Sequence, residues 1–370
     1  MIMQATKPVL ESTTWTKELV QSHAQTAVLV EMYTLPFYLT ALTSIKLPDK
    51  SDTSEQAKFT YETYDAILSV CIEEMLHLQL AANLCLALDI DASKIFQKPI
   101  YGESIPYLAP YDPETMGPQM PSHEALLKAT LGPLNEVTLK TMLDIETPSE
   151  FDTALDHTTP QYPYATIGQM YEALLKGISE VEKNGPVFSW STENQQEQFM
   201  LPPDHKESAL IINQKIACFD DAQQAANLIC SQGEGVNMTP APTPPYKKEQ
   251  FPIKSVYRLY TPIHHSQPGQ PKDPETDTLN QYAHYGRFLW IYNQIEQQNK
   301  AFPNTYPTSV GTPTPEQEKA INDLKAGFDS FITILTSMWA GGSDSSFFSV
   351  MGQLKPLPTK CWQAGIVPQW

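Results

Sequence analysis

The metal-binding pattern of this sequence is clearest in Glu74-Met-Leu-His77. A long apolar helical pattern from about residue 64 to 88 surrounds it. Residues three apart lie on one face of an α-helix, so the carboxylate of Glu74 and the imidazole of His77 can reach the same metal ion. Glu73 also shares a face with His77 and competes for this role; the three-residue spacing favours Glu74.

Three other segments with helical patterns carry residues of the same chemical type. They contribute Glu31, Glu172, and the pair Gln281 and His284. Four-helix bundles that bind two metal ions take one Glu from each of two helices and Glu-x-x-His from each of the other two. This sequence shows that set with one substitution, because Gln281 stands where the second Glu would be. The alternatives are surface positions for Glu31 and Glu172 and an aromatic cluster around His284.

Charge and composition exclude several classes of protein. The chain of 370 residues has 42 acidic and 24 basic residues, and only two of the basic residues are arginines. This balance argues against a nucleic-acid groove and against docking to anionic lipid. We expect no membrane span, because no apolar run reaches 18 residues, and no signal peptide, so the predicted location is cytoplasmic. Five cysteines without a C-x-x-C pair predict free thiols, buried at positions 71, 85, 218 and 230.

The hydrophobic pattern predicts one mainly α-helical domain over residues 1–370. The expected bundle helices span about 14–44, 54–88, 166–184 and 277–299. Pro36 should kink the first helix just over one turn after Glu31. Pro-rich insertions are expected at about 90–160 and 185–272. Further expected elements are helices at about 122–131, 206–230 and 315–339, a short strand at 255–260, and an irregular tail.

Five stretches, in this order, carry a resemblance to a known family. They are Glu31 to Leu39 with Pro36, Glu73 to Leu78, Tyr164 to Glu172, Gln232-Gly-Glu-Gly235, and His284 to Phe288. The sequence resembles a ferritin-like family that includes the iminophenyl-pyruvate dimer synthase of violacein-type pigment biosynthesis. The resemblance implies a ferritin-like four-helix bundle with long Pro-rich loop insertions and extra helices. It also implies a role in secondary metabolism and Glu-x-x-His at 281–284, from which Gln281 departs.

Carboxylate and imidazole ligands suit iron(II), manganese(II) or zinc. We expect iron, as two ions, or as one if Gln281 is not a ligand. The predicted function is an oxygen-activating dimetal-carboxylate oxidase or oxygenase. Its partners would be dioxygen and a small organic, amino-acid-derived substrate, and an oligomer is compatible with this function. The alternative is a non-catalytic metal-binding or scaffold protein with a degenerate site.

Two further polar residues, Glu234 and Arg287, each have two possible roles. Glu234 is either a further carboxylate ligand or a solvated residue at a helix end. Arg287 forms an ion pair with a buried carboxylate or anchors a substrate carboxylate. His264 and His265 are adjacent, so they face opposite ways on an extended chain, and we interpret them as structural.

Overall fold

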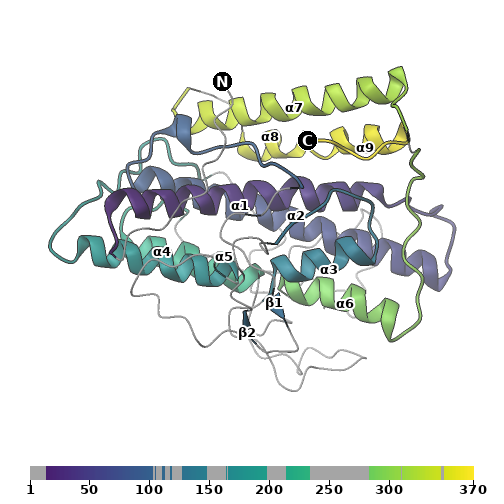
Figure 1. Cartoon of the computed structure of the whole chain (residues 1–370), viewed down its shortest axis with the longest axis horizontal. Coiled ribbons are helices and arrows are strands. Elements are labelled where there is room, and N and C mark those ends of the chain that lie inside the picture. Colours follow the sequence, from purple (N-terminus) through teal and green to yellow (C-terminus); the bar gives the residue numbers. More distant parts are fainter. Residues whose placement is uncertain are drawn as a thin grey trace.

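The structure is a computed structural model, in which two long antiparallel helices form one side of a helical bundle (Figure 1). It describes residues 14–102, 105, 111–112, 117–118, 127–147, 164, 166–197, 214–233, 283–309, 311–342 and 346–370. The long helices are α1 (Lys17–Ser44) and α2 (Glu55–Ala87). The side chains of Thr16 and Ser54 cap their amino ends by accepting hydrogen bonds from backbone N–H groups. This confirms the hairpin predicted over 14–44 and 54–88.

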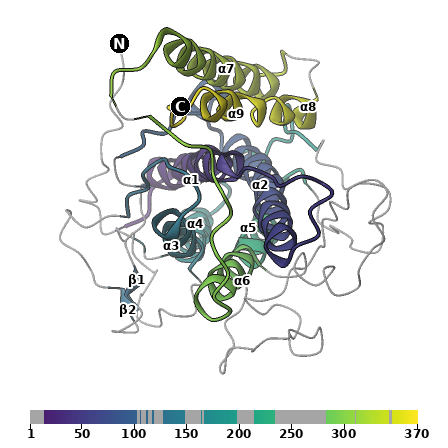
Figure 2. The same ribbon diagram turned by 90° about the vertical axis from the view of Figure 1, so that its right-hand side faces the viewer.

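The other two corners of the bundle are each divided into two shorter helices. Their bounds are α3 (Glu136–Ile145), α4 (Ile167–Glu182), α5 (Phe219–Gly233) and α6 (His284–Glu296). Seen along the bundle, α3 lies in front of α4, and α6 lies in front of α5 (Figure 2). In Figure 1 the members of each pair lie end to end. α4 packs on α1 and α5, whereas α6 packs on α2 and α3.

Four helix ends therefore meet midway along the bundle. The carboxyl ends of α3 and α5 arrive there, and the amino ends of α4 and α6 leave from there. Side chains at these ends contact one another and the centres of α1 and α2: Glu146 follows α3, His284 begins α6, and Gln232 lies in the last turn of α5. The division of the two corners places polar side chains in the middle of an otherwise apolar bundle.

A second layer of helices covers the outer face of α1. It consists of α7 (Pro315–Trp339), α8 (Phe347–Gly352) and α9 (Pro356–Gln363), and α9 packs on both α1 and α7. Trp362 and Trp370 donate indole hydrogen bonds to the backbone carbonyl and the hydroxyl of Thr40 on α1. The remaining elements are the 3-10 turn η1 (Ala92–Lys94) and an antiparallel pair, β1 (Tyr111–Asp112) with β2 (Gly117–Pro118).

Several predicted boundaries are wrong. Residues 127–131 are not helical, so the helix predicted at 122–131 does not reach them; the helix of this region is α3, which a capping box of Asn135 and Thr138 starts. α5 starts at Phe219 rather than near 206, because residues 214–218 are not helical. α6 starts at His284 rather than near 277, because Ala283 is extended, with ψ 162°.

Other predictions on the fold have different outcomes. The helix predicted over 315–339 is confirmed by α7, whereas the tail, predicted to be irregular, contains α8 and α9. α1 continues through Pro36, which cannot donate to the carbonyl of Met32; a bend at this point stays a prediction. The strand predicted at 255–260 lies outside the described residues, and the single domain over 1–370 stays a prediction.

Among the described residues one helix, α2, is long and apolar enough to span a membrane. In its most apolar window 89% of the residues are buried inside the protein. The surrounding helices account for this burial, so the apolar character of α2 is that of a central bundle helix.

His23 is fully buried on α1, and both of its ring nitrogens have partners. Nδ1 lies 2.8 Å from the carbonyl of Leu19 and Nε2 lies 3.0 Å from the hydroxyl of Tyr164. Because a carbonyl can only accept, Nδ1 carries the proton and Nε2 accepts from the tyrosine in a neutral ring. Burial lowers the pKa of His23 from 6.5 to about 4, although the hydrogen bond to Leu19 opposes this.

We therefore predict that His23 makes the metal-free protein sensitive to acid. Since the folded pKa lies below the unfolded one, this stability is fully present above pH 6.5 and is lost as the pH falls toward 4. Its contribution should fall by about 2 kcal/mol between pH 7 and pH 5. Denaturant unfolding at pH 7 and pH 5 should show that the free energy of unfolding falls less for His23→Gln than for the parent. An equal fall in the two proteins would contradict the prediction.

Candidate metal centre

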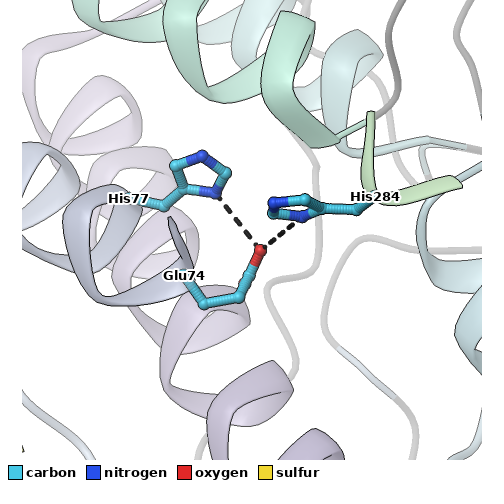
Figure 3. A group of neighbouring side chains, drawn as sticks. All are labelled: Glu74, His77 and His284. Carbon is cyan, nitrogen blue, oxygen red and sulfur yellow. Dashed lines mark ion pairs between the residues drawn. The ribbon is translucent and has the colours of Figure 1, made fainter. Parts of the chain in front are cut away.

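Glu74, His77 and His284 converge at the centre of the bundle (Figure 3). Glu74 Oε1 lies 2.9 Å from His284 Nδ1 and 3.3 Å from His77 Nδ1. The two imidazole rings stack with centroids 5.3 Å apart. At most 2% of each residue is exposed. One carboxylate oxygen and two ring nitrogens therefore face a common point that is closed to solvent.

Local structure explains how these three side chains meet. Glu74 and His77 are one helical turn apart on α2, as their spacing predicted. His284 is the first residue of α6, because Ala283 before it has a non-helical backbone with ψ 162°. The meeting of the helix ends thus brings an imidazole to α2 from a distant part of the chain.

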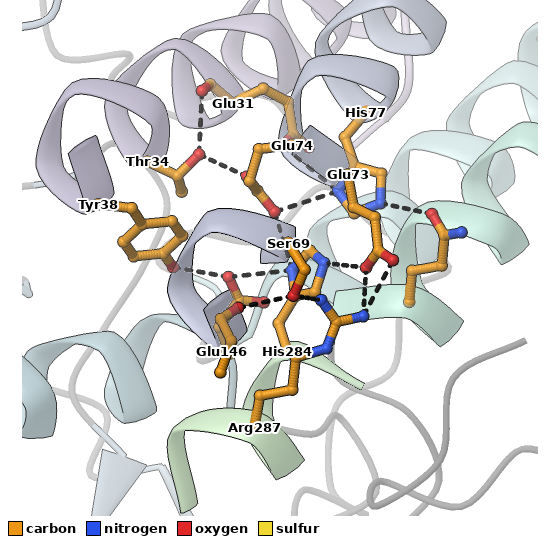
Figure 4. A network of polar contacts seen from close by, with 12 residues as sticks. Glu31, Thr34, Tyr38, Ser69, Glu73, Glu74, His77, Glu146, His284 and Arg287 are labelled. Carbon is orange, nitrogen blue, oxygen red and sulfur yellow. Dashed lines mark hydrogen bonds and ion pairs between the residues drawn. The ribbon is translucent and has the colours of Figure 1, made fainter. Parts of the chain in front are cut away.

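Two further carboxylates flank this group (Figure 4). Glu31 Oε2 lies 3.9 Å from His77 Nδ1, and its Oε1 accepts a 3.0 Å hydrogen bond from the hydroxyl of Tyr171. Glu146 Oε1 lies 3.6 Å from His284 Nδ1 and accepts a 2.6 Å hydrogen bond from Tyr38. Each flanking carboxylate is therefore oriented by a buried tyrosine, one on each side of Glu74.

The two nitrogens of His284 have different surroundings. Nε2 lies 2.8 Å from Glu73 Oε2 and donates to it. Nδ1 is buried and makes no hydrogen bond within the described parts of the chain, although Glu74 Oε1 is only 2.9 Å away. A ring nitrogen that is buried without a hydrogen bond, beside carboxylate oxygens and with its opposite N–H bound to a carboxylate, has the surroundings of a metal ligand.

A second ion pair supports this arrangement from outside. Arg287 Nη2 donates to both oxygens of Glu73, at 2.9 and 2.8 Å, and Nη1 donates to Ser69. The side chains of Arg287, Glu73 and Ser69 are all buried. Arg287 is thus the ion-pair partner of a buried carboxylate, and this contact settles the choice that the sequence left open. Glu73, the rival of Glu74, binds His284 and Arg287 instead.

The charges at this point balance through protons. Burial raises the pKa of Glu31 well above its ordinary value, and the charge of Glu74 raises it further. Burial alone would lower the pKa of His284, but Glu146, Glu73 and Glu74 outweigh it and raise this pKa well above normal. Burial would raise the pKa of Glu74, but His284 and His77 hold it well below normal. Without a bound cation, protons held by these groups compensate part of the negative charge, and a metal ion could replace them.

The donor set fits a first-row transition-metal ion. Carboxylate oxygens and imidazole nitrogens suit iron(II), manganese(II) and zinc, and the described residues here contribute no thiolate. The residues that would hold the ion are Glu31, Glu74, His77, Glu146 and His284. These ligand types do not distinguish among the three metals.

The structure brings together four of the six residues that the sequence nominated. They are Glu31, Glu74, His77 and His284. Glu172 is exposed on α4, whereas its neighbour Tyr171 is buried and contacts Glu31. Successive residues of a helix point about 100° apart, so the two cannot share a face.

The remaining sequence candidates are Gln281, Glu234, His264 and His265, which lie outside the described residues. Because α6 begins at His284, helical spacing does not place Gln281 on one face with it. None of the five cysteines, all of which the structure describes, forms a disulfide, and Cys71 and Cys85 are buried as predicted. Cys218 is exposed and Cys230 is partly buried, so the prediction of burial is wrong for Cys218.

The sequence patterns do not identify Glu146 as a member of the centre or assign a role to Gln232. Glu146 follows a ten-residue helix within the Pro-rich insertion predicted at about 90–160. Its signal was Asn135-x-x-Thr138 ahead of an apolar pattern. Gln232 accepts a 3.0 Å hydrogen bond from His77 Nε2.

Gly233 lies so close to Glu146 that a side chain at this position would contact its carboxylate. A Cβ at Gly233 would lie 2.9 Å from Glu146 Oε2, a carboxylate that Tyr38 already holds. Gly233→Ala should displace Glu146 and lower the free energy of unfolding by about 1–3 kcal/mol. The matched control is Gly352→Ala, which has open space and should cost nothing. Denaturant unfolding measures the stability of both variants. Equal changes in the free energy of unfolding for Gly233→Ala and Gly352→Ala would contradict the contact between position 233 and Glu146.

Comparison with known proteins agrees with the helical-bundle fold. A crystal structure of a ferritin-like protein from Caulobacter vibrioides is similar in fold, with a TM-score of 0.60 at 22% identity over 96% of this chain and 99% of that one. No curated protein matches the chain. The narrower resemblance to the dimer synthase stays a prediction. The model of the family described as ferritin-like matches residues 24–293, most of the sequence, and the chain belongs to that family.

Proposed function

We propose that this chain is a non-haem metal-dependent oxidase or oxygenase, with iron as its metal. The metal would lie among Glu31, Glu74, His77, Glu146 and His284, and the substrates would be dioxygen and a small organic, amino-acid-derived molecule. The observation that carries the proposal is the convergence of two histidine Nδ1 atoms on Glu74 Oε1. One of these nitrogens is buried without a hydrogen bond.

Iron(II) held by oxygen and nitrogen ligands would supply electrons for the reduction of dioxygen. The protein's own contribution is to hold the ligands in place and to exclude water. Thr34 donates to Glu74, while Tyr38 and Tyr171 donate to Glu146 and Glu31. These hydrogen bonds fix the carboxylates before any ion binds, which limits the reorganisation that binding requires.

A second candidate function is metal binding without turnover. The near-complete burial of the centre favours it, because Glu31, Glu74, His77 and His284 are each at most 2% exposed. A closed centre can retain an ion without admitting an organic substrate. This candidate needs the same ligands and differs only in its response to dioxygen.

The chain has 42 acidic and 24 basic residues, and this negative net charge supports our expectation that it has no nucleic-acid partner. A cytoplasmic location, the absence of a membrane partner and the capacity to form an oligomer stay predictions. The substrate class rests on the resemblance to the dimer synthase family. The ion pair of Arg287 with Glu73 favours a structural role for this arginine over that of an anchor for a substrate carboxylate.

Metal titration tests the centre itself. Protein purified without chelator should contain metal, and anaerobic addition of iron(II) to metal-free protein should saturate at one or two equivalents. Glu74→Gln should weaken binding by at least about tenfold, because it removes the shared carboxylate charge. The matched control is Glu172→Gln, an exposed glutamate, which should bind like the parent. A parent without affinity, or equal losses in the two variants, would refute the proposed centre.

Dioxygen separates the two candidate functions. On mixing with air-saturated buffer, the iron-loaded parent should consume dioxygen and change its visible absorption, and Glu74→Gln should do neither. An iron-loaded parent that binds metal tightly and consumes no dioxygen would favour the non-catalytic protein.

A further inference from the structure

The two histidines of the centre are held in the same way. Each turns Nδ1 toward Glu74 Oε1 and places Nε2 against a buried acceptor (Figure 4). For His77 the acceptor is Gln232 Oε1, at 3.0 Å, and for His284 it is Glu73 Oε2, at 2.8 Å. When each ring is neutral, a proton on Nε2 leaves Nδ1 with a lone pair, so both rings can present the same nitrogen to a cation beside Glu74.

The two acceptors differ in charge. Glu73 is a carboxylate, and both of its oxygens accept hydrogen bonds from Arg287 Nη2. Gln232 is a neutral amide. Both residues are completely buried, so water does not screen the difference. An imidazole that donates to a carboxylate becomes a stronger base and a stronger ligand than one that donates to an amide.

The flanking carboxylates divide between the same two histidines. Glu146 lies on the His284 side, 3.6 Å from its Nδ1, and Glu31 lies on the His77 side, 3.9 Å from its Nδ1. Glu74 is shared. The centre thus has a half with His284 and Glu146 and a half with His77 and Glu31. Among the described residues, the acceptors behind the two histidines differ in charge, since one is a carboxylate and the other an amide.

We propose that Glu73 and Gln232 are positioning residues that make the two halves unequal, with the His284 half binding a divalent cation more tightly. The inference rests on the proposed metal centre. Glu73 and Gln232 touch no cation themselves; each acts through the histidine that donates to it. The first cation bound belongs to the His284 half, and a second binds more weakly beside His77.

Stepwise titration of the metal-free protein with cobalt(II) tests this inequality. Visible cobalt absorption reports the ligands of each bound ion, independently of any enzymatic activity. Gln232→Met removes the acceptor for His77 and should weaken the second step about tenfold while leaving the first unchanged. Gln232→Glu should raise the cobalt affinity of the second step and so reduce the difference in affinity between the two steps.

The complementary variant acts on the other half. Glu73→Gln alone would leave Arg287 buried without its counter-charge, so it is combined with Arg287→Gln. The double variant should weaken the first step about 10–100-fold and shift the cobalt spectrum of that step. Gln79→Met is the matched control, because it removes a buried amide that donates to Gln214 rather than one that accepts from a histidine.

The possible outcomes separate the two proposals. A parent that binds no cobalt overturns the metal centre and, with it, the inequality. A parent that binds cobalt while Gln232→Met and the double variant change both steps alike, or neither, overturns the inequality and leaves the centre intact. If the parent binds a single ion, a loss in the double variant without a loss in Gln232→Met supports the proposal, and the reverse overturns it.

Discussion

Four carboxyl groups are buried together in the middle of this bundle, and their charge must be compensated. They belong to Glu31, Glu73, Glu74 and Glu146, each at most 2% exposed. An isolated buried carboxylate is strongly unfavourable, so each needs a counter-charge or a proton. Arg287 neutralises Glu73 permanently. In the described part of the chain, the basic side chains beside the other three are those of two histidines, and shared protons complete the compensation. A divalent cation can replace these protons. The excess of buried negative charge that destabilises the metal-free protein therefore favours binding of a cation.

This compensation depends on the divided corners of the bundle. A continuous helix at each corner would present one side chain per turn to the centre. Two helices meeting end to end present the last residues of one and the first residues of the next. In this way Glu146 and Gln232 arrive at carboxyl ends, while His284 arrives at an amino end. The long helices α1 and α2 supply Glu31, the Glu73–His77 turn and the supporting hydroxyl groups of Thr34, Tyr38 and Ser69. The second histidine and the flanking Glu146 come from the divided corners.

The sequence predicted the undivided parts better than the divided ones, for physical reasons. α1, α2 and α7 are long, apolar and capped, so their periodicity identifies them, and Glu74 with His77 follows from helical spacing alone. Glu146 could not be found in this way, because its position depends on where a ten-residue helix stops. Glu172 has the right chemistry for a ligand, but its apolar neighbours do not define which residue of α4 faces inward, and the helix turns Tyr171 toward Glu31 instead. The partners of Glu73 are 211 and 214 residues away along the chain, and no local pattern specifies such contacts.

The neighbours of the centre also explain why Glu73 and Glu74, adjacent in sequence, take different roles. Residues one apart on a helix point about 100° apart, so Glu74 faces the two Nδ1 atoms while Glu73 faces His284 Nε2 and Arg287. His284 lies between them and contacts both carboxylates, one with each nitrogen. A single imidazole thereby transmits the charge of Glu73 toward the point where Glu74 lies. One turn of α2 thus provides both a candidate ligand and the group that adjusts the strength of another.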